Sequence, residues 1–197
     1  MQIIRFKYQD SAQVSDAKIA DCANQCAEQT VLMRELINAP HNDTPYAFLS
    51  ALYDYATIAE IKNQCTRIHS YDPAILVIVG IGGSNLATMA IAQALQGVVS
   101  PVAMNHMRVY YADTVDTEYI YQIITQVDHA LSVGQKVILY GASKSGTTTE
   151  TIALFELFKE RLQRRYPDTY HHYVVIATDH NSLLYHYGHE QGWYVFS

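Results

Sequence analysis

The sequence predicts an α/β fold in which a doubly wound, five-stranded parallel sheet has N-terminal helices packed on it. Short apolar runs rich in β-branched residues recur in the later part of the chain, and stretches with helical periodicity separate them. The run Ile75–Val79 is apolar at every position, which is typical of a strand buried on both faces. Strands and helices that alternate at this spacing require right-handed crossovers, and such crossovers produce a parallel sheet.

Two helices are expected before the first strand. Residues 16–39 have apolar side chains at helical spacing and are followed by Pro40, which stops the helix. A second helical stretch covers residues 45–64 and opens on a proline. The pattern therefore predicts an N-terminal helical cap over residues 1–70 and a sheet domain over residues 71–197.

The remaining elements are predicted from the same two patterns, short apolar runs for strands and apolar residues at helical spacing for helices. Strands are expected at residues 75–79, 108–111, 137–140, 173–177 and 193–196, and helices at 85–96, 116–129, 148–165 and 181–190. The first of these helices has almost no charge, so we expect it to be buried on most sides. It belongs to an uncharged segment, Pro73–Met107, which Gly82 and Gly83 interrupt, and this interruption argues against a membrane span.

Composition narrows the classes of partner. The chain has 197 residues, of which 49% are hydrophobic, and this permits one sizeable core. It has 13 Lys and Arg against 19 Asp and Glu and no polybasic cluster, so we expect no nucleic-acid partner. The N-terminus lacks an apolar stretch of signal-peptide length, and the odd cysteine count favours a reducing, cytoplasmic setting. We expect Cys22, Cys26 and Cys65 to be small buried apolar residues rather than metal ligands.

Two loops are predicted to meet at one position of the sheet. In a sheet of order 2-1-3-4-5, the first and third strands are neighbours and their connections leave on opposite faces, which opens a crevice at their carboxyl ends. The loops that reach this crevice are Gly80–Asn85 and Gly141–Thr148. Both are rich in Gly, Ser and Thr, and both lead directly into a predicted helix.

These loops have the chemistry of a phosphate site. A helix N-terminus presents free N–H groups and about half a positive charge, and glycine lets an anion approach the backbone. Hydroxyl groups can donate to several phosphate oxygens, and Lys144 adds a local positive charge to an acidic chain. The predicted phosphate-binding residues are Gly83, Ser84, Ser143, Lys144, Ser145, Gly146, Thr147 and Thr148. Either loop alone is also compatible with an ordinary βα turn, and residues 147–150 fit a capping box.

Three other motifs are excluded by spacing. A dinucleotide fingerprint requires Gly or Ala three places after its second Gly, where Asn85 stands. A P-loop requires Lys directly after its second Gly, where Thr147 stands. A nucleophile elbow requires Gly two places after Ser84, where Leu86 stands.

Three segments together resemble the N-terminal sugar-isomerase (SIS) domain of the glucose-6-phosphate isomerase family: Gly80–Leu86, Tyr111–Asp116 and Ser143–Thr151. The resemblance runs from about Ile75 to the end of the sequence, in order and at the expected spacing. It implies a flavodoxin-like strand order. It also implies that the sugar phosphate is held by the residues that match the family's motifs, namely Gly83, Ser84 and residues 143–148.

The resemblance implies an aldose–ketose isomerase that interconverts glucose 6-phosphate and fructose 6-phosphate in glycolysis and gluconeogenesis. The family uses no metal and no cofactor, and we expect a homodimer in the full-length form and no membrane partner. The reaction needs an acid/base pair to open the ring and a carboxylate that moves a proton between C1 and C2. In the family, the residues that do this lie beyond the position matching Ser197. We therefore expect no catalytic residue here, and interpret the chain as the phosphosugar-binding half of an isomerase, inactive alone.

Acidic and histidine residues of this chain do not fill the catalytic role. Glu150 is expected to cap a helix beside the phosphate, where a base would be misplaced for C1 and C2. His186 and His189 are expected at the surface, and the pair His171-His172 in a solvated loop. The alternative is a stand-alone module that senses sugar phosphate or regulates a partner. A coding sequence that continues into Gly-Gly-Arg-Tyr-Ser would favour the isomerase, and a stop codon after Ser197 would favour the module.

Overall fold

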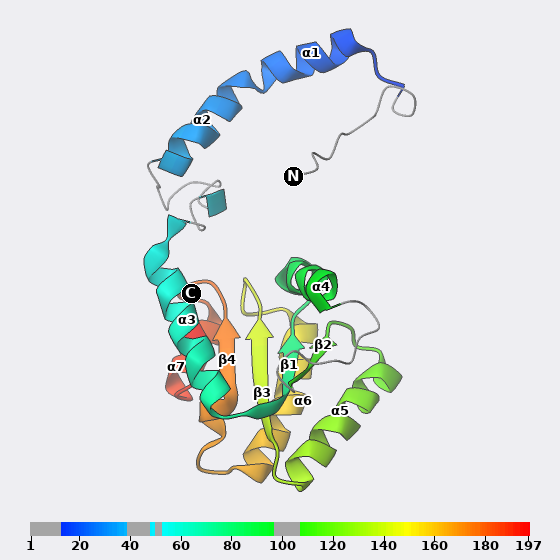
Figure 1. Ribbon diagram of the computed structural model, residues 1–197, viewed down its shortest axis with the longest axis vertical. Coiled ribbons are helices and arrows are strands. Elements are labelled where there is room, and N and C mark those ends of the chain that lie inside the picture. The colour runs from blue at the N-terminus through cyan, green and yellow to red at the C-terminus, as the bar shows by residue number, and fades with distance from the viewer. Residues whose placement is uncertain (1–12, 39–47, 50–52, 97–106) are drawn as a thin grey trace. The chain divides into compact units, whose positions relative to one another are not determined.

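The computed structural model describes residues 13–38, 48–49, 53–96 and 107–197, and the chain divides into two compact units, residues 1–62 and 63–197 (Figure 1). The boundary lies inside helix α3 (Tyr55–Ser70) rather than after residue 70. The end of α3 belongs to the second unit, because the Arg67 guanidinium lies over the rings of Tyr71 and Tyr194, at 5.7 and 5.5 Å from their centroids.

Two helices form where the sequence predicts one helix over residues 16–39. Helix α1 spans Asp16–Gln25 and helix α2 spans Ala27–Asn38. The break is at Cys26, whose N–H donates to Cys22 and Asn24 at the end of α1. Neither Gly nor Pro marks this position, so the periodicity alone does not reveal the break. The predicted start of the second helix, at residues 45–47, lies outside the described residues.

The second unit contains the predicted sheet. Five parallel strands, β1 (Pro73–Val79), β2 (Arg108–Ala112), β3 (Lys136–Ala142), β4 (Val174–Ala177) and β5 (Tyr194–Phe196), pair in the order β2-β1-β3-β4-β5. The predicted α/β class, parallel sheet and strand order are therefore confirmed, and the packing of N-terminal helices on the sheet stays a prediction. Val79 at the end of β1 pairs with Ala112 on β2 and with Gly141 on β3. Since these strands finish level with one another, the loops that follow β1 and β3 begin side by side.

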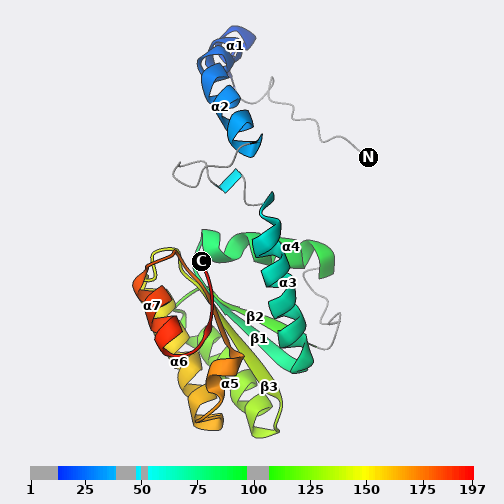
Figure 2. The ribbon, with the colours of Figure 1, turned by 90° about the vertical axis from the view of Figure 1, so that its left-hand side faces the viewer.

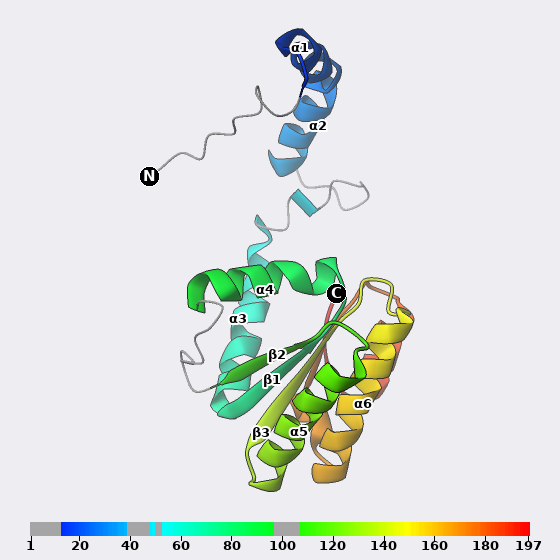
Figure 3. The ribbon, with the colours of Figure 1, turned by 90° about the vertical axis from the view of Figure 1, so that its right-hand side faces the viewer.

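Helices lie on both faces of the sheet. After α3, the described residues form α4 (Gly83–Gln96), α5 (Thr117–Ser132), α6 (Thr149–Arg165) and α7 (Leu183–Glu190), and a 3-10 turn covers Tyr170–Tyr173. Figures 2 and 3 show α5 and α6 on one face and the end of α3 on the other. Alternate strand residues, such as Val77 and Leu139, form the core with Ile123 of α5 and Phe158 of α6. Burial of these side chains stabilises the sheet that positions the loops.

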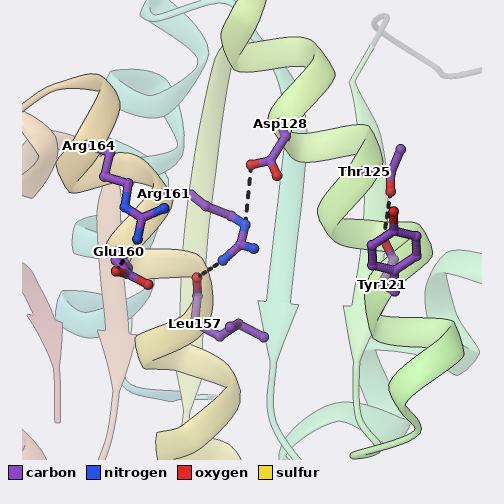
Figure 4. Close-up of polar contacts among 7 residues, drawn as sticks. All are labelled: Tyr121, Thr125, Asp128, Leu157, Glu160, Arg161 and Arg164. Atoms are coloured by element: carbon purple, nitrogen blue, oxygen red, sulfur yellow. Dashed lines mark hydrogen bonds and ion pairs between the residues drawn. The ribbon is translucent and has the colours of Figure 1, made fainter.

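An ion pair joins the C-terminal half of α6 to α5. The Arg161 guanidinium is 3.2 Å from the Asp128 carboxylate of α5 and donates to the Leu157 carbonyl at 2.6 Å (Figure 4). One turn along, Arg164 pairs with Glu160 at 2.6 Å. The ion pair across the two helices is partly exposed, so it contributes modestly to stability. Together with the core contacts it fixes the axis of the helix that starts at the second loop.

Two burial predictions are wrong. Helix α4 is largely exposed, with exposed fractions of 59% at Leu86, 62% at Ile91 and 76% at Leu95. Figure 3 shows α4 running across the end of the sheet rather than along a face, so most of its apolar side is uncovered by the described residues. All three cysteines are also exposed: Cys22 and Cys65 lie on α1 and α3, which bury none of their side chains, and Cys26 lies at the break after α1. No helix in the described ranges has the length and apolar character that a membrane span requires.

Candidate phosphate-binding site

The first loop turns sharply out of β1 and into α4. Gly82 has φ +58°, a left-handed conformation that favours glycine. The Gly82 carbonyl then accepts from the N–H groups of Asn85 and Leu86, and these bonds start the helix. The Asn85 side chain is 1% exposed, and its Nδ2 donates to the Gly80 carbonyl at 2.9 Å. These bonds close the loop and place Ser84 in the first turn of α4.

The second loop is held by its own hydrogen bonds. The Ser143 N–H donates to the Ala177 carbonyl of β4 at 3.0 Å, and Ser143 is 3% exposed. The Ser143 hydroxyl accepts from the Gly146 N–H at 3.2 Å and lies 3.4 Å from the Thr148 hydroxyl. Gly146 has φ +66°, so the chain again turns through the left-handed region. These contacts bring Ser143 and Thr148 to the same side of the loop.

The start of α6 differs from the predicted capping box. The residue at the cap position is Thr148 rather than Thr147, and its hydroxyl makes no capping hydrogen bond. The Thr147 hydroxyl instead donates to the Ser145 hydroxyl at 3.0 Å. The N–H groups of the first turn of α6 have no intrahelical acceptor, as at every helix start. Without a side-chain cap at Thr148, these donors can serve a ligand.

A cavity of about 270 Å³ lies between the two loops. It is lined by Ile81, Ser84, Ala142, Ser143, Lys144, Ser145, Thr148, Thr151 and Asp179. Predicted site residues that line it are Ser84, Ser143, Lys144, Ser145 and Thr148. Gly83, Gly146 and Thr147 belong to the same loops but do not line the cavity. Their part in phosphate binding stays a prediction, as does that of the lining residues.

Sequence reasoning missed two polar residues of the cavity. Thr151 is 2% exposed and lies three residues after Thr148 on α6, so helical spacing places both on one side. Asp179 follows β4, which pairs with β3. Since the predicted strand order already made β3 and β4 neighbours, the loop after β4 could have been expected beside the loop after β3.

The turn between β4 and α7 forms hydrogen bonds to the second loop. The Lys144 carbonyl accepts from the Asp179 N–H at 3.0 Å and from the Thr178 hydroxyl at 3.4 Å. The Thr178 and Ser182 hydroxyls are 2.8 Å apart, and the Ser182 hydroxyl accepts from the Tyr185 N–H at the start of α7. The backbone of Lys144 is therefore anchored to a second strand–helix connection.

Among the described residues, the cavity wall has one positive and one negative side chain. The Lys144 ammonium and the Asp179 carboxylate are both exposed and form no ion pair with any described residue. The other polar side chains at the wall are hydroxyls, each of which can donate. No group of three His, Cys, Asp or Glu side chains in the described ranges is arranged to hold a metal ion. The arrangement is suited to an anion with several oxygens.

The side chains considered as catalytic substitutes do not line this cavity. Glu150 is exposed and does not line the cavity. His186 and His189 are exposed on α7, in line with their predicted surface position. His171 and His172 lie in the 3-10 turn before β4 rather than in an irregular loop, at the end of the sheet opposite the cavity.

The fold and site define a class: a doubly wound parallel α/β domain with a hydroxyl-lined cavity at the switch point of its sheet. Residues 68–190 match the family model described as phosphoglucose isomerase. The chain therefore belongs to the phosphoglucose isomerase family.

Relatives and solved structures agree with this assignment. Glucose-6-phosphate isomerase of Listeria monocytogenes serotype 4b is 37% identical over 120 residues, which cover 58% of this chain and 25% of that protein. The enzyme of the same name from Acetivibrio thermocellus is 26% identical over 172 residues, which cover 84% of this chain and 37% of that protein. The chain thus spans between a quarter and two fifths of the length of these relatives.

Solved structures also resemble the chain. A hypothetical protein from Thermus thermophilus has a TM-score of 0.66 and 21% identity, covering 90% of this chain and 40% of that one, and this likeness concerns the fold. A glucose-6-phosphate isomerase from Chlamydia trachomatis has a TM-score of 0.53 and 25% identity, and the match covers 73% of this chain and 27% of that one.

Proposed function

We propose that this chain is the phosphosugar-binding part of a glucose-6-phosphate isomerase and that its cavity holds the phosphate of glucose 6-phosphate or fructose 6-phosphate. The observation that carries the proposal is the cavity between two glycine-containing loops, with five hydroxyl side chains and Lys144 at its wall, in a chain of this family. The proposal includes a cytoplasmic setting, no cofactor, and a homodimer in the full-length form.

The physical basis of phosphate binding is the supply of donors. Uncapped N–H groups at the start of α6 and the positive end of its dipole face the same region as the hydroxyls of Ser143 and Thr148. Lys144 supplies a full positive charge, and hydrogen bonds to a charged group are stronger than neutral ones. A phosphate dianion has enough oxygens to accept from all of these groups at once.

The alternative function, a stand-alone module that senses sugar phosphates, is favoured by one observation. Among the described residues, the cavity wall includes a single carboxylate and no histidine, so it lacks the acid/base pair that ring opening requires. Binding of a sugar phosphate is common to both functions, and isomerase activity distinguishes them.

The first prediction concerns ligand class. We expect the purified chain to bind fructose 6-phosphate in isothermal titration calorimetry, and inorganic phosphate or sulfate to compete with it. Unphosphorylated fructose should give no measurable heat, because the donors at the cavity wall would have no anion to bind. Equal affinities for fructose and its phosphate would contradict the proposed site.

The second prediction concerns individual donors. We expect Lys144→Ala and Thr148→Val each to weaken fructose 6-phosphate binding about tenfold or more, since a hydrogen bond to a charged group contributes about 1.5–3 kcal/mol. Both positions are outside the core cluster, so the circular dichroism spectrum should be unchanged.

Matched controls exist for both substitutions. Lys136→Ala removes the same charge at the start of β3, at the opposite end of that strand. Thr169→Val makes the same change at an exposed threonine whose hydroxyl forms no capping bond. Both controls should bind like the parent chain, and parent-like binding by the two site variants would place the ligand elsewhere.

A further inference from the structure

Among the described residues, Asp179 is the one acidic residue at the wall of the cavity. We infer that its carboxylate makes the site selective for phosphate esters that carry hydroxyl groups, over phosphate itself. This inference rests on the proposed function and identifies the residue that recognises the part of the ligand beyond the phosphate.

The position of Asp179 is determined by backbone contacts. Its N–H donates to the Lys144 carbonyl at 3.0 Å, and the neighbouring Thr178 hydroxyl donates to the same carbonyl at 3.4 Å. Thr178 is 7% exposed and lies 2.8 Å, hydroxyl to hydroxyl, from Ser182 at the start of α7. Asp179 is therefore held next to Lys144 by a buried network, and does not reach the cavity through a free loop.

The charge of Asp179 is available to a ligand. Its carboxylate forms no hydrogen bond or ion pair with any described residue, although the Lys144 ammonium belongs to the same wall. A carboxylate can only accept hydrogen bonds, whereas the hydroxyls and the ammonium beside it can donate. A ligand that pairs with all of these groups must offer anionic oxygens to the hydroxyls and the ammonium, and hydrogen-bond donors to the carboxylate. A phosphorylated polyhydroxyl compound offers both.

Inorganic phosphate can pair with only some of the groups at the cavity wall. Its oxygens match the donors, but its negative charge is repelled by the Asp179 carboxylate across the same cavity. The cavity, of about 270 Å³, also has room for more than a phosphate group. The remaining space borders a group that accepts hydrogen bonds from hydroxyls.

The test compares two ligands on one variant. Fructose 6-phosphate and inorganic phosphate are titrated into the parent chain and into Asp179→Asn, which keeps the side-chain shape and removes the charge. In the variant, fructose 6-phosphate loses the charge-assisted hydrogen bonds of its hydroxyls, so its affinity should fall about tenfold relative to that of inorganic phosphate. Inorganic phosphate should bind as tightly as before or more tightly, because a like charge is removed. The ratio of the two affinities should therefore fall about tenfold or more.

Controls separate this effect from a general change of charge. Asp168→Asn makes the same substitution at an exposed residue in the connection after α6, and should leave the ratio unchanged. Asp179→Ser removes the charge with a different side chain and should lower the ratio as Asp179→Asn does, so the test does not depend on one variant folding. An unchanged ratio in both Asp179 variants overturns the inference. If the parent chain binds neither ligand, the proposed phosphate site fails before any variant is compared.

Discussion

The isolated chain should interconvert glucose 6-phosphate and fructose 6-phosphate at least about 100-fold more slowly than a full-length member of the family, because a positioned general base contributes about 10²–10⁴-fold. The reaction requires a carboxylate that faces C1 and C2 while the phosphate is held between the loops. Glu150 does not line the cavity, and Asp179, the one acidic residue at its wall among the described residues, is proposed to accept hydrogen bonds from the ligand's hydroxyls rather than to move a proton. Phosphate binding holds substrate and transition state almost equally, so it adds little to the rate by itself.

A coupled assay in both directions measures this activity. The chain is assayed alone, and then mixed with a separately produced C-terminal part of a full-length relative, which should raise the rate if the two parts associate. Turnover by the chain alone at the rate of a full-length enzyme would contradict the prediction. In that case Asp179→Asn would show whether the carboxylate that the described residues place at the cavity wall is the base.

Substitution of Gly146 by alanine should weaken fructose 6-phosphate binding about 100-fold, because the second loop would have to move. Gly146 has φ +66°, a conformation that costs an L-residue about 1–2 kcal/mol. A Cβ atom at this position would lie 2.8 Å from the Ser182 hydroxyl and 3.0 Å from the Leu184 backbone nitrogen, both at the start of α7. Relief of these contacts displaces the Gly146 N–H from the Ser143 hydroxyl. Loss of two hydrogen bonds to a charged ligand, at about 1.5–3 kcal/mol each, corresponds to about 100-fold or more.

Gly134 provides a matched control for this substitution. It has φ +81°, and a Cβ atom there would have no neighbour within 4 Å. Gly134→Ala therefore has the same kind of backbone cost without the steric conflict, in the connection between α5 and β3. We expect it to lower the melting temperature and to leave binding unchanged, as measured by calorimetry. Tight binding by Gly146→Ala would show that the loop geometry is not needed for the ligand.

The strands and their order could be predicted from local patterns. A short apolar run such as Ile75–Val79 has one stable environment, the middle of a sheet covered on both faces, and the alternating helices make that sheet parallel. Burial of a helix is harder to predict. An uncharged segment such as α4 shows that a surface is apolar, but not that another part of the molecule covers it. Leu95 is apolar and yet 76% exposed, which its side chain alone does not indicate. The break at Cys26 has no local signal in the sequence.

The sequence by itself determined the fold class, the two loops at the switch point and the resemblance to a family, because each depends on residues close together along the chain. Only the tertiary structure decided which side chains share the cavity. Ser84, Lys144 and Asp179 lie in the connections that follow three different strands, and they meet because β1, β3 and β4 pair in register. Strand pairing is a contact between distant segments, so Asp179, which has no motif of its own, enters the site only when the sheet forms.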